Sequence, residues 1–172
     1  ATYDNSGWAV SLSRDGSVVA IGAYGNDGNG EKSGHVRIYQ NTNGTWTKIG
    51  DDIDGEAAAN YSGQSVSLSA DGSVVAIGAP YNDGSGTNSG HIRIYQNVGG
   101  SWTQVGSDID GEAVGDRSGY SVSLSSDGSV VAIGAPGNDG SNATNRFHES
   151  GHVRIYQNVG GSWTQVGSDI DG

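Results

Sequence analysis

The sequence predicts an all-β chain of three similar repeats, each a sheet of four short antiparallel strands. Three observations support this prediction. One segment occurs three times, as AVSLSRDGSVVAIGAY from Ala9, SVSLSADGSVVAIGAP from Ser65 and SVSLSSDGSVVAIGAP from Ser121. Its first half alternates apolar and polar residues, as a strand with one buried face does. No stretch carries apolar residues at the helical period of about 3.6 residues.

The repeat boundaries follow from a Ser-Gly dipeptide. It recurs at intervals of 56 residues, as Ser6-Gly7, Ser62-Gly63 and Ser118-Gly119. We therefore divide the chain into residues 1–55, 56–111 and 112–172. The third repeat is longer because of an insertion near residues 141–149. Insertions cost least in loops, so we expect a loop there.

The second repeat shows the first half of the expected element order. A strand near residues 64–69 has its apolar side chains on one face. Asp71-Gly72 then predicts a tight hairpin turn, since both residues tolerate a positive φ. Residues 74–79 form a continuous run of small and β-branched apolar residues. Such a run is typical of a strand covered on both faces, so the second strand is expected to lie deepest.

The second half of the repeat supplies two more strands. A loop at residues 80–90 is rich in Asn, Asp, Gly and Ser. Residues 91–96 alternate again and predict the third strand. A turn at residues 97–100 leads to a fourth strand at about residues 101–109, which contains Trp102. Tight turns between short alternating runs favour antiparallel pairing throughout.

Four-stranded sheets repeated at this interval predict blades of a β-propeller rather than coils of a β-helix. Gly22, Gly78 and Gly134 lie inside the deepest strand, where a glycine usually marks the close approach of another backbone. Three blades are too few to close a ring. We therefore expect an incomplete propeller or an open repeat array; a β-sandwich or an open stack of sheets is the alternative.

Several motifs resemble the FG-GAP repeat of integrin-α-type propellers. The matching positions in the second repeat are Ser62-Gly63, Gly78-Ala79-Pro80 and the run from Gly90 to Tyr95. The first repeat departs from the pattern at Tyr24, where proline is expected. The Asp-Gly hairpin is also similar to WD-repeat blades. Calcium-binding members carry an Asp-rich loop between the first two strands. Here that loop is only residues 70–73, so the resemblance does not imply their calcium site.

Composition excludes several classes of function. The formal charge is −11, and there is no cysteine. A surface this acidic repels phosphate groups, so we expect no nucleic-acid partner and no docking on anionic lipid. Without cysteine the chain has neither disulfides nor thiolate chemistry. No apolar run is long enough to insert into a membrane.

Three loops carry candidate calcium ligands. Asp27, Asp83 and Asp139 each follow an Asn and precede a Gly, and oxygen ligands on such turns suit Ca²⁺. Asx-turn chemistry explains the same residues without a metal. The Asp-x-Asp-Gly-Glu junctions that begin at Asp52 and Asp108 do not have the EF-hand spacing. We therefore expect no cofactor, with calcium as the alternative.

The tryptophans and histidines are the other candidate binding residues. Trp8, Trp46, Trp102 and Trp163 could stack on sugar rings, but packing between blades is the favoured role for the three that recur. Trp8 is unmatched in the other repeats and is expected to be partly exposed. For the recurring histidines, His35, His91 and His152, a surface or turn-capping role is expected rather than a ring of metal ligands.

Three glycosylation sequons begin at Asn43, Asn60 and Asn142. All three lie in expected loops, where acceptors are accessible.

No catalytic constellation is recognisable, so no enzymatic activity is expected. The sequence thus predicts an extracellular structural or adhesive module whose partners are its own copies or further repeats of a longer chain. These would complete a closed propeller or extend into a filament. The alternative is a lectin-like or integrin-like propeller that binds glycans or extracellular proteins through its rim loops.

Overall fold

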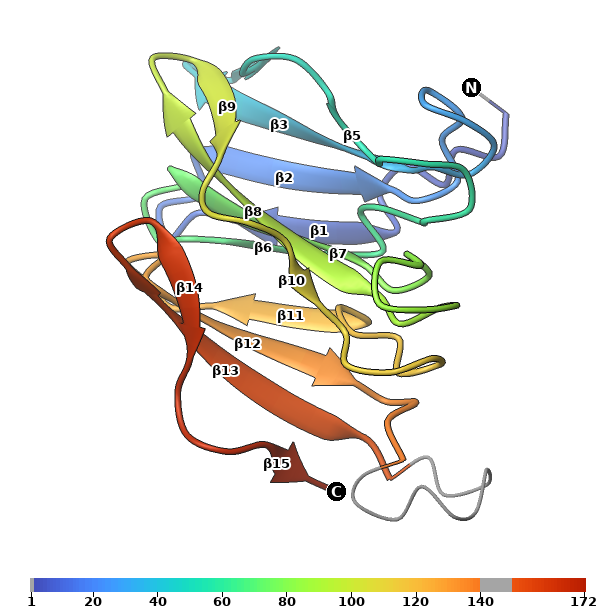
Figure 1. Cartoon of the computed structure of the whole chain (residues 1–172). Helices are drawn as coiled ribbons and strands as arrows, with labels where there is room; N and C mark the ends of the chain where they lie inside the picture. The colour runs from blue at the N-terminus through green and yellow to red at the C-terminus, as the bar shows by residue number, and fades with distance from the viewer. Residues whose placement is uncertain (1, 140–149) are drawn as a thin grey trace.

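The computed structural model describes residues 2–139 and 150–172 and shows three β-sheets that follow one another along the chain (Figure 1). The first sheet contains β1 (Ala9–Leu12), β2 (Val18–Ala23), β3 (His35–Thr42), β4 (Thr45–Lys48) and β5 (Ile53–Asp54). The second contains β6 (Ser65–Leu68), β7 (Val74–Ala79), β8 (His91–Val98), β9 (Ser101–Gln104) and β10 (Ile109–Asp110). The third contains β11 (Ser121–Leu124), β12 (Val130–Ala135), β13 (His152–Val159), β14 (Ser162–Gln165) and β15 (Ile170–Asp171).

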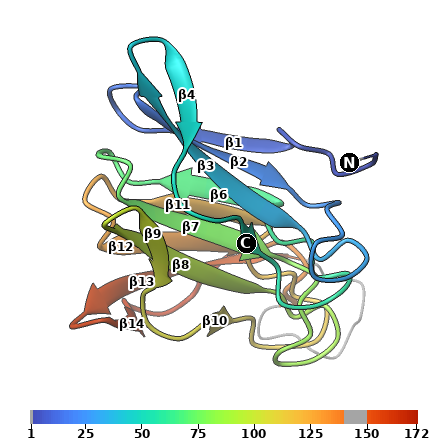
Figure 2. The same cartoon turned by 90° about the horizontal axis from the view of Figure 1, so that it is seen from above.

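This architecture confirms the all-β fold with three antiparallel, propeller-type blades. The blades stack side by side as an open arc, with the two ends of the chain on opposite end blades (Figures 1 and 2). Neighbouring blades contact each other along their first strands, β1, β6 and β11, while the second strand of the middle blade, β7, is buried along nearly its whole length. The insertion expected near residues 141–149 lies outside the described residues. The described part of the chain contains no helix with the length and apolarity of a membrane span.

The fourth strand differs from its expected extent. Residues 101–109 were expected to form one strand, but β9 and β10 are separate, and both pair with β8. Between them, Val105 donates its backbone N–H to the Ile94 carbonyl, and the chain then leaves the ladder. The segment bends at Gly106, whose φ is +74°. That left-handed conformation suits glycine and ends a strand.

The core consists of two apolar seams between neighbouring blades. In the first seam, one face of the first blade packs on the opposite face of the second; its buried members are Val18, Ala20, Val36, Ile38, Ile53, Leu68, Val75, Ile77 and Tyr95. The second seam repeats the arrangement one blade further on, with Ala76, Ile92, Ile94, Ile109, Val131 and Ile133. Each blade therefore presents a different face to each of its neighbours.

The glycines of the second strands allow this close packing. A Cβ at Gly22 would overlap the carbonyl of Gly63 in the next blade, and one at Gly78 would overlap the carbonyl of Gly119. The expected approach of another backbone is thus confirmed at both positions. Gly134 is the equivalent residue of the last blade, and there the three described atoms nearest to an added Cβ all belong to Ser121 of its own blade.

A carboxylate organises each hairpin turn between the first two strands. Asp127 accepts hydrogen bonds from the Ser125 hydroxyl at 2.6 Å and from the Ser129 backbone at 3.0 Å. These donors lower the pKa of Asp127 to about 2. Asp15 is held in the same way and its pKa is also lowered to about 2. The short Asp-Gly turn therefore closes a hairpin with its own serines.

The arc leaves one seam-forming face open at each end. On the first blade, the N-terminal face exposes Val10 by 64%, Leu12 by 59% and Trp46 by 45%. On the last blade, the C-terminal face exposes Ile170 by 59%, whereas its equivalent Ile109 is 5% exposed inside the second seam. The two open faces correspond to the two halves of an internal seam.

Candidate functional site

The three recurring histidines begin the third strand of each blade and are buried. His35, His91 and His152 are 2%, 1% and 5% exposed, so the expected surface role is wrong. The reason is their position in the ladder. His35 stands between Ala23 of β2 and Asp54 of β5. Pairing on both sides brings the carboxylates of Asp52 and Asp54 against the imidazole.

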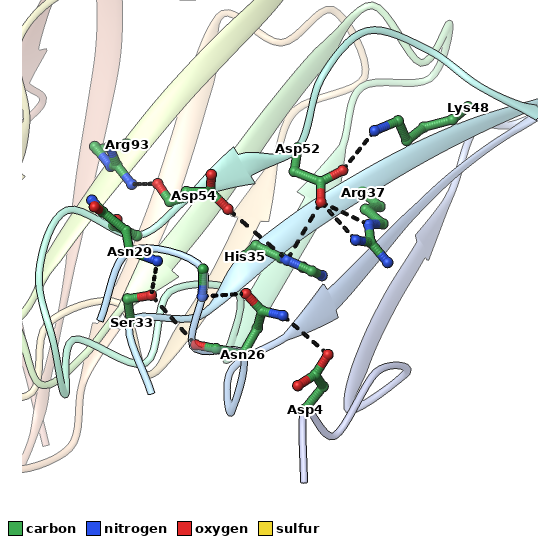
Figure 3. Close-up of polar contacts among 12 residues, drawn as sticks. Asp4, Asn26, Asn29, Ser33, His35, Arg37, Lys48, Asp52, Asp54 and Arg93 are labelled. Atoms are coloured by element: carbon green, nitrogen blue, oxygen red, sulfur yellow. Dashed lines mark hydrogen bonds and ion pairs between the residues drawn. The ribbon is translucent and has the colours of Figure 1, made fainter. Parts of the chain in front are cut away.

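Carboxylates from the Asp-x-Asp-Gly-Glu junctions face these histidines. In the first blade, His35 Nδ1 lies 3.7 Å from Asp52 Oδ2 and 4.0 Å from Asp54 Oδ1 (Figure 3). Arg37 and Lys48 both bind Asp52, each with a shortest contact of 2.7 Å. The Arg37 guanidinium, followed by Lys48, holds the pKa of Asp52 well below its usual range. Burial, with the nearby Arg37, lowers the pKa of His35. This cluster is a closed ion-pair network.

The second blade arranges the same positions differently. His91 Nδ1 lies 3.4 Å from Asp108 Oδ2 and 3.8 Å from Glu56 Oε2. Gln104 donates to the other Asp108 oxygen at 2.6 Å. The facing imidazole lowers the pKa of the Asp108 carboxyl. Arg93 crosses the first seam and donates to the Asp54 backbone carbonyl at 2.7 Å (Figure 3).

The third blade places the same residue types around its histidine, although among the described residues it is His152 Nε2, not Nδ1, that has no hydrogen-bond partner. His152 Nδ1 lies 3.7 Å from Asp169 Oδ2 and 3.9 Å from Glu112 Oε2. Gln165 donates to Asp169 Oδ1 at 2.6 Å. Arg154 crosses the second seam to the Asp110 carbonyl at 2.8 Å. A His-carboxylate cluster thus accompanies each of the two seams.

Aromatic side chains line a groove on the end of the blades where the first strands begin. Trp8 packs edge-on against Tyr24 with centroids 4.9 Å apart, and Tyr61 lies 5.6 Å from Tyr24 and 4.9 Å from Tyr81. The groove has a volume of about 540 Å³, and Tyr120 contributes to its wall. Its lining is asymmetric, because the equivalents of Tyr24 in the other repeats are prolines.

The structure divides the four tryptophans by role. The indole N–H of Trp102 donates to the Ile49 carbonyl at 3.0 Å, and that of Trp163 donates to the Val105 carbonyl at 2.8 Å. Both residues pack across a seam, as favoured from the sequence. Trp46 is exposed on the N-terminal face because no blade precedes the first one. Trp8 is 62% exposed, in agreement with its expected position.

The candidate calcium residues lie in separate loops. Asp27 accepts the Lys32 backbone N–H at 2.8 Å, and Asp83 accepts that of Asn88 at 2.8 Å. Each carboxylate therefore closes its own loop. Asp139 follows Asn138 in the equivalent loop of the last blade. Calcium binding at these positions stays a prediction.

The sequons have different surroundings. Asn43 is exposed at the tip of the hairpin between β3 and β4. Asn60 is 6% exposed, so the expected accessible position is wrong for this residue. Its side-chain oxygen accepts the Ala57 N–H at 3.1 Å and the Asn82 amide at 3.2 Å, which draws it into the loop core. Asn142 lies outside the described residues.

Sequence reasoning missed two groupings. The first is the convergence of each buried histidine with the acidic junction of its blade. The recurrence of both motifs in every repeat was the available signal, but strand register was needed to bring them together. The second is the aromatic groove. Tyr24, Tyr61 and Tyr81 interrupt the repeat pattern, and such departures could have been compared with that of Trp8.

Comparisons with known proteins bear on the fold. Residues 1–39 and 52–95 match the family described as FG-GAP repeat. No curated protein matches the chain. A provisionally assigned 6-phosphogluconolactonase from Bacteroides uniformis is similar in structure, with a TM-score of 0.62 and 15% identity, over 94% of this chain and 39% of that one.

Two further solved structures show the same likeness. Sqt1 from Saccharomyces cerevisiae gives a TM-score of 0.57 at 14% identity, over 99% of this chain and 36% of its own. The periplasmic gluconolactonase PpgL from Pseudomonas aeruginosa gives 0.55 at 17% identity, over 95% and 57%. This chain therefore spans between about a third and three fifths of the length of the structures it resembles. At such identities the likeness shows the fold alone.

Proposed function

Residues 1–39 and 52–95 match the FG-GAP repeat family, and on this premise we propose that the chain is a non-catalytic extracellular building block. Its function is to bind further blades, supplied by copies of itself or by more repeats, through its two open faces. The observation that carries the proposal is the correspondence between these faces and the two halves of each internal seam. The acidic surface and the exposed sequon at Asn43 support an extracellular setting.

Hydrogen bonds cross both internal seams and support the proposal, because an incoming blade could form the equivalent bonds. Arg14 donates its backbone N–H to the Ala70 carbonyl at 2.8 Å, and Ala70 donates to the Ser126 carbonyl at 2.8 Å. These three residues are equivalent in the three repeats. Among the described residues, the Ser126 N–H and the Arg14 carbonyl have no such partner. A copy docked head to tail would join the two.

A second set of hydrogen bonds also crosses both seams and lacks its equivalent on the end blades. The Leu68 N–H donates to the Ser11 hydroxyl of the preceding blade at 3.0 Å, and the Leu124 N–H donates to that of Ser67 at 2.9 Å. Ser123 is the equivalent residue of the last blade. Within the described chain no following blade donates a backbone N–H to its hydroxyl. An exposed apolar face with vacant seam bonds favours association.

The assembly state tests this proposal. We expect the 172-residue chain to form oligomers in native mass spectrometry and small-angle scattering. Ile170→Lys places a charge on the C-terminal face and is expected to shift the chain to monomer, because burying an unpaired ammonium is costly. Val98→Lys is the control, since Val98 is 60% exposed on a hairpin away from both faces. A wild-type chain that stays monomeric and soluble at high concentration would overturn the proposal.

The aromatic groove favours a second candidate function, glycan binding. Trp8 and its tyrosine neighbours offer flat apolar rings with polar edges, which suit the faces of sugars. Trp8→Ala is expected to weaken retention on a glycan array by roughly tenfold, since an aromatic contact is worth about 0.5–1.5 kcal/mol beyond its buried area. Trp46→Ala, outside the groove, is the control. Equal binding by both variants would contradict this role.

A further inference from the structure

The clusters at the two seams have the composition of a metal site. Glu56, His91 and Asp108 each offer one ligand atom, and these atoms lie within 4.8 Å of one another. Glu112, His152 and Asp169 do the same in the next repeat. We propose that each of these two clusters binds one divalent transition-metal ion, such as Zn²⁺, beside a seam between blades.

The imidazole of the second blade points to a ligand that would complete the cluster. The His91 side chain is 2% exposed, yet within the described part of the chain its Nδ1 has no hydrogen-bond partner. Its separations of 3.4 Å from Asp108 and 3.8 Å from Glu56 are longer than ordinary hydrogen bonds. Two ligands of one tetrahedral zinc ion, each about 2.0–2.2 Å from the metal, lie roughly 3.3–3.6 Å apart. The Asp108 distance from His91 Nδ1 falls within this spacing, and the Glu56 distance is slightly longer.

The outer oxygens of both carboxylates are already occupied. Gln104 donates to Asp108 Oδ1 at 2.6 Å, while Oδ2 turns toward His91. Arg93 lies 3.7 Å from Glu56 Oε1, while Oε2 turns toward His91. Partners that hold the far side of a ligating carboxylate are typical of metal sites, because they fix the direction of the ligating oxygen.

In the first repeat, a lysine side chain takes the place that a metal ion would have beside the aspartate. There Lys48 binds the aspartate that faces the histidine, at 2.7 Å. The equivalent residues in the other repeats are the neutral Gln104 and Gln165. Together, Arg37 and Lys48 balance Asp52 and Asp54 in the first cluster. In the second cluster, His91 faces Glu56, Asp108 and Asp110, and within the described residues the recorded arginine or lysine ion pair is that of Arg93 with Glu56, so negative charge is in excess.

The ligand chemistry selects the class of ion. One imidazole nitrogen with carboxylate oxygens suits borderline metals such as Zn²⁺, whereas Ca²⁺ prefers six or more oxygens. Glu56 follows β5 of the first blade, and His91 and Asp108 belong to the second blade. An ion at this site would therefore tie neighbouring blades together.

Zinc titration of the chelator-treated chain tests the assignment. By calorimetry and native mass spectrometry, we expect two bound Zn²⁺ ions per chain and a higher melting temperature. Gln104→Lys copies Lys48 of the first repeat, so the fold is expected to tolerate it, and the stoichiometry should fall to one. Glu56→Gln removes an exposed ligand and should weaken the same site by roughly 10–100-fold or more.

A variant in the first cluster provides the matched control. Asp54→Asn changes a carboxylate that faces His35, and binding of two ions should persist. Circular dichroism of each variant establishes that it folds. Absence of zinc binding by the wild-type chain would overturn the proposal. So would zinc binding that neither Gln104→Lys nor Glu56→Gln reduces, since scattered surface carboxylates would then hold the ions.

Discussion

Gly22→Ala is expected to destabilise the chain by about 3 kcal/mol or more, because there is no room for a methyl group at the first seam. The added Cβ would overlap the backbone carbonyl of Gly63 in the next blade. A backbone carbonyl cannot rotate away as a side chain can, so relief requires the blades to separate. Since the φ of Gly22 lies outside the left-handed region, the cost comes from the clash alone. Urea denaturation followed by tryptophan fluorescence measures it.

Gly134→Ala is the matched control for this prediction. Gly134 occupies the same position in the last blade, where an added Cβ meets the Ser121 hydroxyl, a side-chain atom that can turn away. The monomer should therefore lose much less stability than with Gly22→Ala. If copies dock on the C-terminal face, Gly134→Ala should still weaken their association, because an incoming carbonyl would approach this glycine. Equal destabilisation by the two variants would contradict the backbone-clash argument.

Ile77→Ala is expected to lower the free energy of unfolding by about 2–5 kcal/mol, the range for an isoleucine truncated in a packed core. Ile77 is 1% exposed in the first seam, and it lies on β7 with Ile21 as its equivalent on β2. Removing its side chain leaves a cavity between two blades. The rigid sheets on either side limit how far that cavity can collapse. Chemical denaturation gives the difference from the wild-type chain.

Ile21→Ala makes the same chemical change on an open face. Ile21 is only partly buried, because no blade precedes the first. We expect less than half the loss of stability seen with Ile77→Ala in the monomer, together with weaker self-association. A loss as large as that of Ile77→Ala under monomeric conditions would show that something other than the seam sets the cost.

Local patterning was sufficient for much of the fold. Alternation and the Asp-Gly turn placed the first hairpin of each repeat, and the expected residues 74–79 coincide with β7. The split of the fourth strand into β9 and β10 was missed, because a bend at Gly106 depends on where the chain must leave the ladder. Register with β8 decides that point, and the alternation of residues does not reveal it.

The candidate sites depended more on tertiary contacts. The role of Trp102 at a seam was expected from its recurrence, whereas the burial of His91 was not. A histidine that follows a glycine-rich loop is expected at the surface from its sequence neighbours. Strand pairing sets Ala79 and Asp110 on either side of His91, and carboxylates from three positions face its imidazole. The partners of His91 come from residues 56 and 108, and no local pattern joins them.

Sequence alone therefore established a repeating all-β chain with too few blades to close, because strand period and turn chemistry are local and recur three times. The tertiary structure decided which face of each blade is buried and which is left open. It also decided that the acidic junctions meet the histidines. These outcomes depend on how one sheet packs against the next, and equivalent residues such as Ile109 and Ile170 differ only in whether a further blade covers them.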